Sequence, residues 1–141
     1  MTPSSVKTLD KCGFGWMRFT VGGVEKMMKL IGVDQLQNAQ SRCADLGARV
    51  PLPRNANENA DYLVAFRQFV GSGSHVPLGV NDVNSEGDWR DNDGNPAAFT
   101  NWNSGEPNNL GNEDYVHMMT ADGLWNDHLA TLTISIICER E

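Results

Sequence analysis

The sequence has no long apolar run and few basic residues. No apolar stretch approaches the roughly 18 residues that a membrane-spanning helix requires, and the mean hydropathy is −0.41. Acidic residues outnumber basic ones, 18 to 11, so the formal net charge is −7. Phosphate backbones and anionic lipid surfaces repel an acidic chain. Nucleic acid and membrane insertion are therefore excluded from the expected interactions.

Cysteine is also scarce, and its spacing argues against two kinds of site. Cys12, Cys43 and Cys138 are the three cysteines, and no two of them have the CxxC spacing that is typical of zinc and redox sites. Three thiols allow at most one disulfide within the chain. No apolar signal segment follows Met1, so the sequence fits either a cytosolic protein or the mature part of a secreted one.

The chain length fits one domain, and its first half predicts a strand and two helices. A length of 141 residues is ordinary for a single domain. Residues 26–31 are predicted to form a strand, and apolar residues at helical spacing predict a helix over 34–47 with Asp34 as its N-cap. A second helix is predicted to begin at Asn55, because Glu58 completes a capping-box-like start. Residues 114–119 and 131–138 alternate or run apolar like paired strands.

The second half of the chain is acidic and rich in asparagine. Residues 76–131 hold ten Asp and Glu but one basic residue, Arg90, whereas residues 1–75 hold nine basic residues and six acidic ones. Nine Asn fall within residues 81–112, which predicts a long irregular region of a kind that is usually functional. Crowded carboxylates repel one another unless a cation offsets them, and hard divalent cations prefer oxygen ligands. A solvated acidic face is the alternative interpretation.

Three short motifs in this region combine carboxylates with amides. They are Glu-Pro-Asn-Asn at 106–109, Glu-Asp at 113–114 and Trp-Asn-Asp at 125–127. Such groups suit a calcium shell, which takes about six to eight oxygen ligands. On these motifs the sequence resembles the carbohydrate-recognition domain of the C-type lectins. The resemblance runs from about residue 30 to residue 139 and includes residues 53–59, 78–82, 86–89, 101–102 and 137–139.

The resemblance implies a fold, a domain organisation and a set of ligands. The fold is α+β, with two helices, small antiparallel sheets and a long calcium-binding loop region. A single domain is expected over residues 1–141, in which residues 1–25 form an N-terminal extension and the first strand region. The implied calcium ligands are Glu106, Asn108, Glu113, Asn126 and Asp127 at a principal site, with Asp82, Glu86, Asn109 and Asp114 at an auxiliary site. The implied disulfide joins Cys43 to Cys138.

The chemistry of the principal site suits a sugar. Two neighbouring hydroxyls can enter a calcium shell, and each then has one proton to donate and a lone pair to fill. Carboxylates accept and amide NH2 groups donate, so two acids and two amides satisfy both hydroxyls. In the family, the Glu-Pro-Asn order goes with mannose-type sugars, whose 3- and 4-hydroxyls are equatorial, and with a cis bond before Pro107. The implied sugar-binding residues are Glu106, Asn108, Glu113, Asn126 and Asp127, with Leu110 packing on the sugar ring.

The chain departs from the family pattern at its cysteines. Tyr115 and Ala130 occupy the two positions where members usually have a disulfide-bonded pair. Loss of such a disulfide removes roughly 2 to 4 kcal/mol, so the loops are expected to depend more on the ion. Disulfides persist outside the cell, and the resemblance therefore implies a secreted or extracellular protein. Cys12 is expected to be free or to link two copies of the chain in a homo-oligomer.

The expected function is calcium-dependent binding of mannose-type glycans on cell surfaces or glycoproteins, without catalysis. A lectin-like domain that binds a protein or another non-sugar ligand such as ice is the main alternative, because the fold does not dictate the ligand. A hydrolase that uses paired carboxylates is a remote alternative. An EF-hand at residues 91–94 is rejected, because the loop lacks the required glycine and later glutamate. Those four residues are predicted to form a turn.

Overall fold

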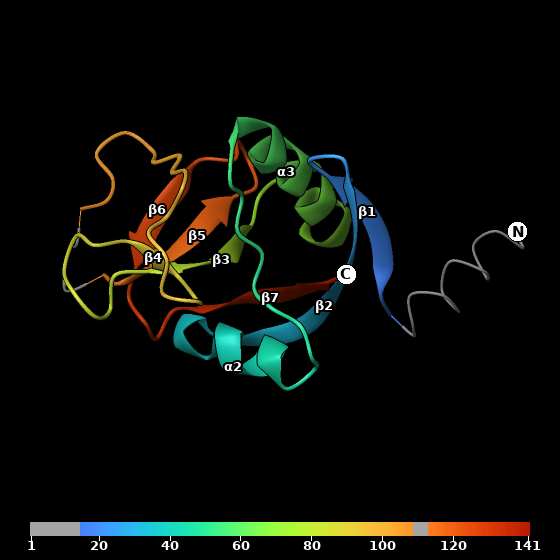
Figure 1. The fold of residues 1–141 in the computed structure, drawn as a ribbon, viewed down its shortest axis with the longest axis horizontal. Coiled ribbons are helices and arrows are strands. Elements are labelled where there is room, and N and C mark those ends of the chain that lie inside the picture. Colours follow the sequence, from blue (N-terminus) through green and yellow to red (C-terminus); the bar gives the residue numbers. More distant parts are fainter. Residues whose placement is uncertain (1–14, 109–112) are drawn as a thin grey trace, which may run out of the picture.

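The computed structural model describes residues 15–108 and 113–141. Its first sheet has three antiparallel strands in the order β1-β2-β7. The strands are β1 (Met17–Val21), β2 (Val24–Gln35) and β7 (Thr133–Arg140). β7 pairs with β2, so this sheet joins the two ends of the described chain (Figure 1). The strand predicted over residues 26–31 is confirmed but is longer, because an irregularity between Leu30 and Gly32 lets pairing with β7 continue to Gln35.

Two α-helices follow, as the sequence predicts. The first begins as the 3-10 turn η1 (Leu36–Asn38) and continues as α2 (Ala39–Ala44). The predicted N-cap at Asp34 is wrong, because Asp34 belongs to β2 and its carboxylate pairs with Arg42 at 2.7 Å. The second helix is α3 (Ala56–Val70). Its predicted start is confirmed, since the Asn55 side chain accepts a hydrogen bond from the Glu58 N–H at 2.8 Å.

The second sheet has four antiparallel strands in the order β4-β3-β5-β6. They are β3 (His75–Asn81), β4 (Arg90–Asp91), β5 (Tyr115–Met119) and β6 (Trp125–His128). The two C-terminal segments that the sequence predicts as strands are confirmed as β5 and β7, and they belong to different sheets. Between β3 and β5 the described chain is irregular apart from β4, and Figure 1 shows these loops at the end of the molecule away from β1. A turn forms at residues 91–94, as predicted, with the Gly94 N–H donating to the Asp91 carbonyl at 3.1 Å.

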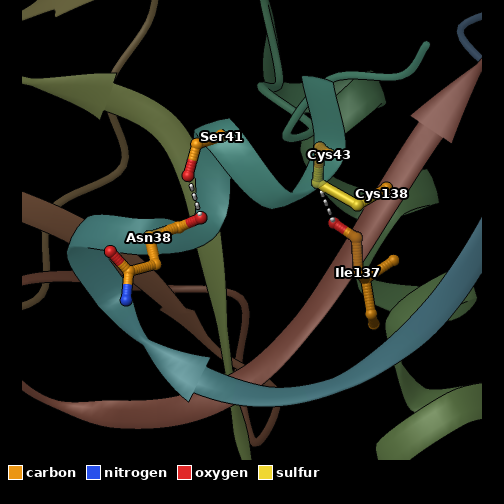
Figure 2. The surroundings of a disulfide bond; sticks show 5 residues. All are labelled: Asn38, Ser41, Cys43, Ile137 and Cys138. Carbon is orange, nitrogen blue, oxygen red and sulfur yellow. Dashed lines mark hydrogen bonds between the residues drawn. A yellow bond between two sulfur atoms is a disulfide. The ribbon is translucent and has the colours of Figure 1, made fainter. Parts of the chain in front are cut away.

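Two hydrophobic clusters support the sheets. The larger one packs α3 against both sheets through fully buried side chains such as Tyr62, Phe66, Met28 and Met118. The smaller one lies between α2 and the first sheet and includes the predicted Cys43–Cys138 disulfide, whose Cα atoms are 5.4 Å apart. Figure 2 shows this bond joining α2 to β7. Within the described residues, no helix is both long and apolar enough to span a membrane.

Candidate metal centres

The first acidic cluster lies where the loop around residue 106 meets β6 and the start of β5. Carboxylate oxygens of Glu106, Glu113 and Asp127 all lie within 4.8 Å of one another. Glu113 and Asp127 are buried, with 8% and 2% of their surface exposed. The structure therefore brings together three of the predicted principal ligands, although they are separated by up to 21 residues in the sequence.

Backbone and side-chain hydrogen bonds hold the loop against β6. The Asn108 N–H donates to Asp127 Oδ1 at 3.1 Å, and Asn108 Nδ2 donates to Glu106 Oε2 at 3.0 Å. The Glu106–Pro107 peptide bond is cis, as the resemblance implies. Behind the loop, the Asn103 N–H donates to the Trp125 carbonyl at 2.9 Å. These bonds join the Glu-Pro-Asn and Trp-Asn-Asp motifs into one unit.

The cluster contains a buried carboxylate oxygen that lacks a donor. Glu106 Oε1 is buried and has no hydrogen-bond partner among the described residues. A buried polar atom left in this state costs about 1–3 kcal/mol. Burial and the neighbouring Asp127 raise the pKa of Glu106 to about 7. The carboxylates are thus held closer together than their charges favour, and a cation would relieve both penalties.

Asn126 is positioned differently from the other principal residues. It precedes Asp127 on β6, and consecutive side chains of a strand point to opposite faces of the sheet. Its Nδ2 lies 3.3 Å from Met119 Sδ, and its Oδ1 is buried without a partner among the described residues. No motif in the sequence predicts the contact with Met119, because it depends on how β5 and β6 align. The role of Asn126 as a ligand stays a prediction.

A second acidic cluster adjoins the first. Carboxylate oxygens of Asp82, Glu86 and Asp114 lie within 4.8 Å of one another. Asp82 is 2% exposed, and its Oδ2 accepts a hydrogen bond from the Gly87 N–H at 2.8 Å. Gly87 adopts a positive φ of 80°, a conformation that glycine favours. Glu113 and Asp114 are consecutive, so this dipeptide supplies one carboxylate to each cluster.

The second cluster repeats the electrostatic features of the first. Asp82 Oδ1 is buried without a hydrogen-bond partner among the described residues. Burial is the largest cause that raises the pKa of Asp82 and of Asp114, and each is also affected by its carboxylate neighbours. The structure therefore brings together three of the four predicted auxiliary ligands. The fourth, Asn109, lies outside the described residues, as do Leu110 and Cys12.

The donor atoms in both clusters suit calcium. Both consist of carboxylates, with amide side chains close by in sequence, and Ca²⁺ is coordinated by oxygen at about 2.3–2.6 Å. Softer ions would favour imidazole or thiolate ligands, and neither cluster includes His or Cys among the described residues. Each cluster also contains a buried carboxylate oxygen without a hydrogen-bond partner in the described chain. Both sites therefore fit a hard divalent cation.

Comparison with known proteins identifies the family. The family model for the lectin C-type domain matches residues 33–140, and the chain belongs to this family. The mouse scavenger receptor C-type lectin carbohydrate-recognition domain is 26% identical with a TM-score of 0.78, over 92% of this chain and 98% of that chain. The predicted C-type lectin fold, with two helices and small antiparallel sheets, is confirmed.

Two further solved structures share this fold. The carbohydrate-recognition domain of cow CD23, determined in the presence of a GlcNAc2Man3 oligosaccharide, is 24% identical with a TM-score of 0.72, over 92% of this chain and 95% of that chain. A calcium-independent type II antifreeze protein is 19% identical with a TM-score of 0.72, over 92% of this chain and 93% of that chain. At these identities the likeness shows the fold alone. Calcium dependence must therefore be argued from this chain's own residues.

Proposed function

We propose that this chain is a calcium-dependent carbohydrate-binding module with a preference for mannose-type glycans and no catalytic activity. The observation that carries the proposal is the pair of buried carboxylate oxygens, Glu106 Oε1 and Asp82 Oδ1, that lack hydrogen-bond donors among the described residues. Each lies in a cluster of three converging carboxylates. A calcium ion in each cluster offsets the charge and satisfies these oxygens. A calcium-independent antifreeze protein has the same fold, so the fold alone does not support calcium binding.

The ligands follow from the clusters and the resemblance together. Glu106, Asn108, Glu113, Asn126 and Asp127 hold the principal ion, and Asp82, Glu86, Asn109 and Asp114 hold the auxiliary one. When bound, the principal ion supplies coordination positions for two neighbouring sugar hydroxyls. The side chains around the ion then accept and donate the remaining hydrogen bonds of those hydroxyls.

Chelation tests calcium dependence. We expect binding to immobilised mannan in saturating calcium and loss of this binding in excess EDTA. Asp127→Asn removes one charge but keeps an oxygen that can accept from the Asn108 N–H, so it should weaken calcium binding without opening the loop. Asp93→Asn is the matched control, because Asp93 is exposed and belongs to neither cluster. Binding that persists unchanged in EDTA would contradict the proposal and favour a non-sugar or calcium-independent ligand.

The order of donor and acceptor around the ion supports the preference for mannose-type sugars. Asn108 Nδ2 donates to Glu106 Oε2 at 3.0 Å, so the acid and the amide face each other across Pro107. The double variant Glu106→Gln, Asn108→Asp reverses this hydrogen bond without removing it. It also keeps a side-chain oxygen at each position for calcium, while the groups offered to the sugar exchange roles.

Sugar choice is therefore testable with this double variant. A buried polar group left without its partner costs about 1–3 kcal/mol, which is roughly tenfold to a hundredfold in affinity. We expect inhibition by mannose to weaken by that factor at saturating calcium, while calcium binding is retained. Galactose inhibition is measured in parallel. If the variant retains its calcium and its full mannose preference, specificity does not come from the Glu-Pro-Asn order.

The setting of this function is also a proposal. The Cys43–Cys138 bond suits an oxidising environment, so we place the protein outside the cell, where its partners are glycans on cell surfaces or glycoproteins. A disulfide between the Cys12 residues of two copies would raise avidity. Non-reducing electrophoresis of the full chain, compared with Cys12→Ser, tests this link. A dimer that survives the substitution would contradict the role of Cys12.

A further inference from the structure

Two histidines meet on a face of the second sheet, outside the acidic clusters. His75 lies at the start of β3 and His117 in the middle of β5. Their Nδ1 atoms are 3.1 Å apart, and their ring centroids are 4.7 Å apart. The two ring planes are inclined at 66° to each other, in an edge-on arrangement.

Strand register explains why these residues meet. Pro77 lies directly opposite His117, and His75 lies directly opposite Met119. His75 is therefore a diagonal cross-strand neighbour of His117 on the same face of the sheet, within reach of a ring side chain. The backbone of two paired strands thus fixes the geometry, and neither residue lies on a loop.

Burial differs between the two rings. His117 is 2% exposed, whereas His75 is exposed to solvent. Burial favours the neutral form of an imidazole, which is the form that binds metal ions. The pair therefore combines one fixed, neutral ring with one that solvent reaches.

We propose that His75 and His117 form a two-histidine site for a late first-row divalent metal ion such as Zn²⁺, coordinated by both Nδ1 atoms. Zinc binds imidazole nitrogen at about 2.0–2.1 Å, so two such nitrogens lie about 2.9 Å apart at a right angle and about 3.4 Å apart at a tetrahedral angle. The observed 3.1 Å falls between these values. Water completes the shell from the exposed His75 side.

This site differs in chemistry from the acidic clusters. Imidazole suits zinc, copper and nickel, whereas calcium takes oxygen ligands, so saturating calcium should occupy the clusters and leave the histidine pair to zinc. His128 is the third histidine nearby, with its ring centroid 5.7 Å from that of His117. Its Nδ1 already accepts a hydrogen bond from the Leu129 N–H at 2.8 Å. His128 is therefore outside the proposed site and serves as a control.

Calorimetric titration with zinc chloride, in saturating calcium, tests the site. The full chain with Cys12→Ser is used throughout, because a free thiol would itself bind zinc. We expect one zinc ion per chain. Loss of even an outer-shell partner costs about tenfold or more in metal affinity, so His75→Gln should weaken zinc binding by at least that factor. His128→Gln should leave zinc affinity unchanged, and thermal unfolding without zinc checks that both variants fold.

Nitrogen NMR of the imidazole rings supplies a readout independent of mutation. Zinc should shift the Nδ1 resonances of His75 and His117 together and leave those of His128 in place. Three outcomes would overturn the proposal. They are zinc binding equal in the parent and in His75→Gln, equal weakening by His128→Gln, and Nδ1 resonances that do not respond to zinc. In each case the 3.1 Å contact is only a hydrogen bond between two imidazoles.

Discussion

Buried carboxylates occur in two kinds of setting in this molecule. Glu139 is surrounded by donors from its own chain, whereas the carboxylates of the two acidic clusters mainly face one another. Glu139 is 2% exposed. Its carboxylate accepts hydrogen bonds from the Tyr62 hydroxyl at 2.5 Å, from Arg49 Nε at 2.7 Å and from Lys26 Nζ at 3.4 Å. In the clusters, Glu106 and Asp82 each keep one buried oxygen without a donor among the described residues.

The difference follows the distribution of charge along the sequence. The cationic partners of Glu139 come from residues 1–75, which hold nine basic residues. Both clusters come from residues 76–131, where Arg90 is the one basic residue against ten acids. Arg90 pairs with Asp88 at 2.8 Å, outside either cluster. The region around Glu139 therefore balances its own charge, whereas the acidic clusters lack cationic side chains among the described residues, which supports the proposed calcium ions.

The largest expected effect comes from breaking the Glu139 network. Glu139→Ala removes the anionic partner of the mostly buried Lys26 ammonium, and such a loss costs about 3–5 kcal/mol. Glu141→Ala is the matched control, because Glu141 also pairs with Arg49 at 2.7 Å but is exposed. Exposed pairs contribute about 0–1 kcal/mol. Urea unfolding in saturating calcium measures both, and equal losses would show that burial does not distinguish the two acids.

Removal of the disulfide should have the next largest effect. The Cys43–Cys138 bond closes a loop of 95 residues, and a native disulfide contributes about 2–4 kcal/mol. Cys43→Ala with Cys138→Ala should lower the free energy of unfolding by that amount. Calcium affinity should not change, because both cysteines pack between α2 and the first sheet, away from the clusters. A parallel loss of calcium affinity would contradict the division into two halves.

The fold was predictable from the sequence where local chemistry decides it. Asn55 and Glu58 predicted the start of α3 because the cap is a contact between neighbours in sequence. The N-cap assigned to Asp34 failed because β2 continues past Gly32 to pair with β7, about 100 residues away along the chain. The assignment of the two C-terminal strands to separate sheets likewise depends on long-range pairing. Sequence periodicity does not specify such pairing.

The candidate site was predictable for a different reason. The resemblance implied that Glu106, Glu113 and Asp127 converge. These residues are far apart in sequence, but each belongs to one of three motifs that occur in the order typical of the family. The contact of Asn126 with Met119 and that of His75 with His117 carried no such signal. Both depend on which residues of neighbouring strands lie opposite or diagonal to each other.

Calcium itself should stabilise the protein by a smaller amount. A ligand at about 100 times its dissociation constant adds about 2.7 kcal/mol to the free energy of unfolding. Because the Glu139 network and the clusters share no residues, the gain should be equal in the parent and in Glu139→Ala. Thermal and urea unfolding with calcium and with EDTA measure it in both chains. A gain that disappears in Glu139→Ala would show that the two regions are coupled.

The smallest expected effect is a pH dependence that changes sign with calcium. Without calcium, the pKa of Glu106 is raised to about 7 from an ordinary value of 4.5, because of burial and the nearby Asp127. The native state then holds a proton that the unfolded state has lost, so the contribution of Glu106 is fully present below 4.5 and declines as the pH rises to about 7.

Calcium should reverse this trend, because the ion binds the ionised carboxylates and protons compete with it. We therefore expect unfolding free energies to fall between about pH 5 and about pH 7.5 in EDTA and to rise over the same interval in calcium. Raised pKa values of Asp82 and Asp114 act in the same direction as that of Glu106. Glu106→Gln should flatten the slope in EDTA, whereas Asp93→Asn should leave it unchanged. A slope that Glu106→Gln does not alter would assign the pH dependence to groups outside the principal cluster.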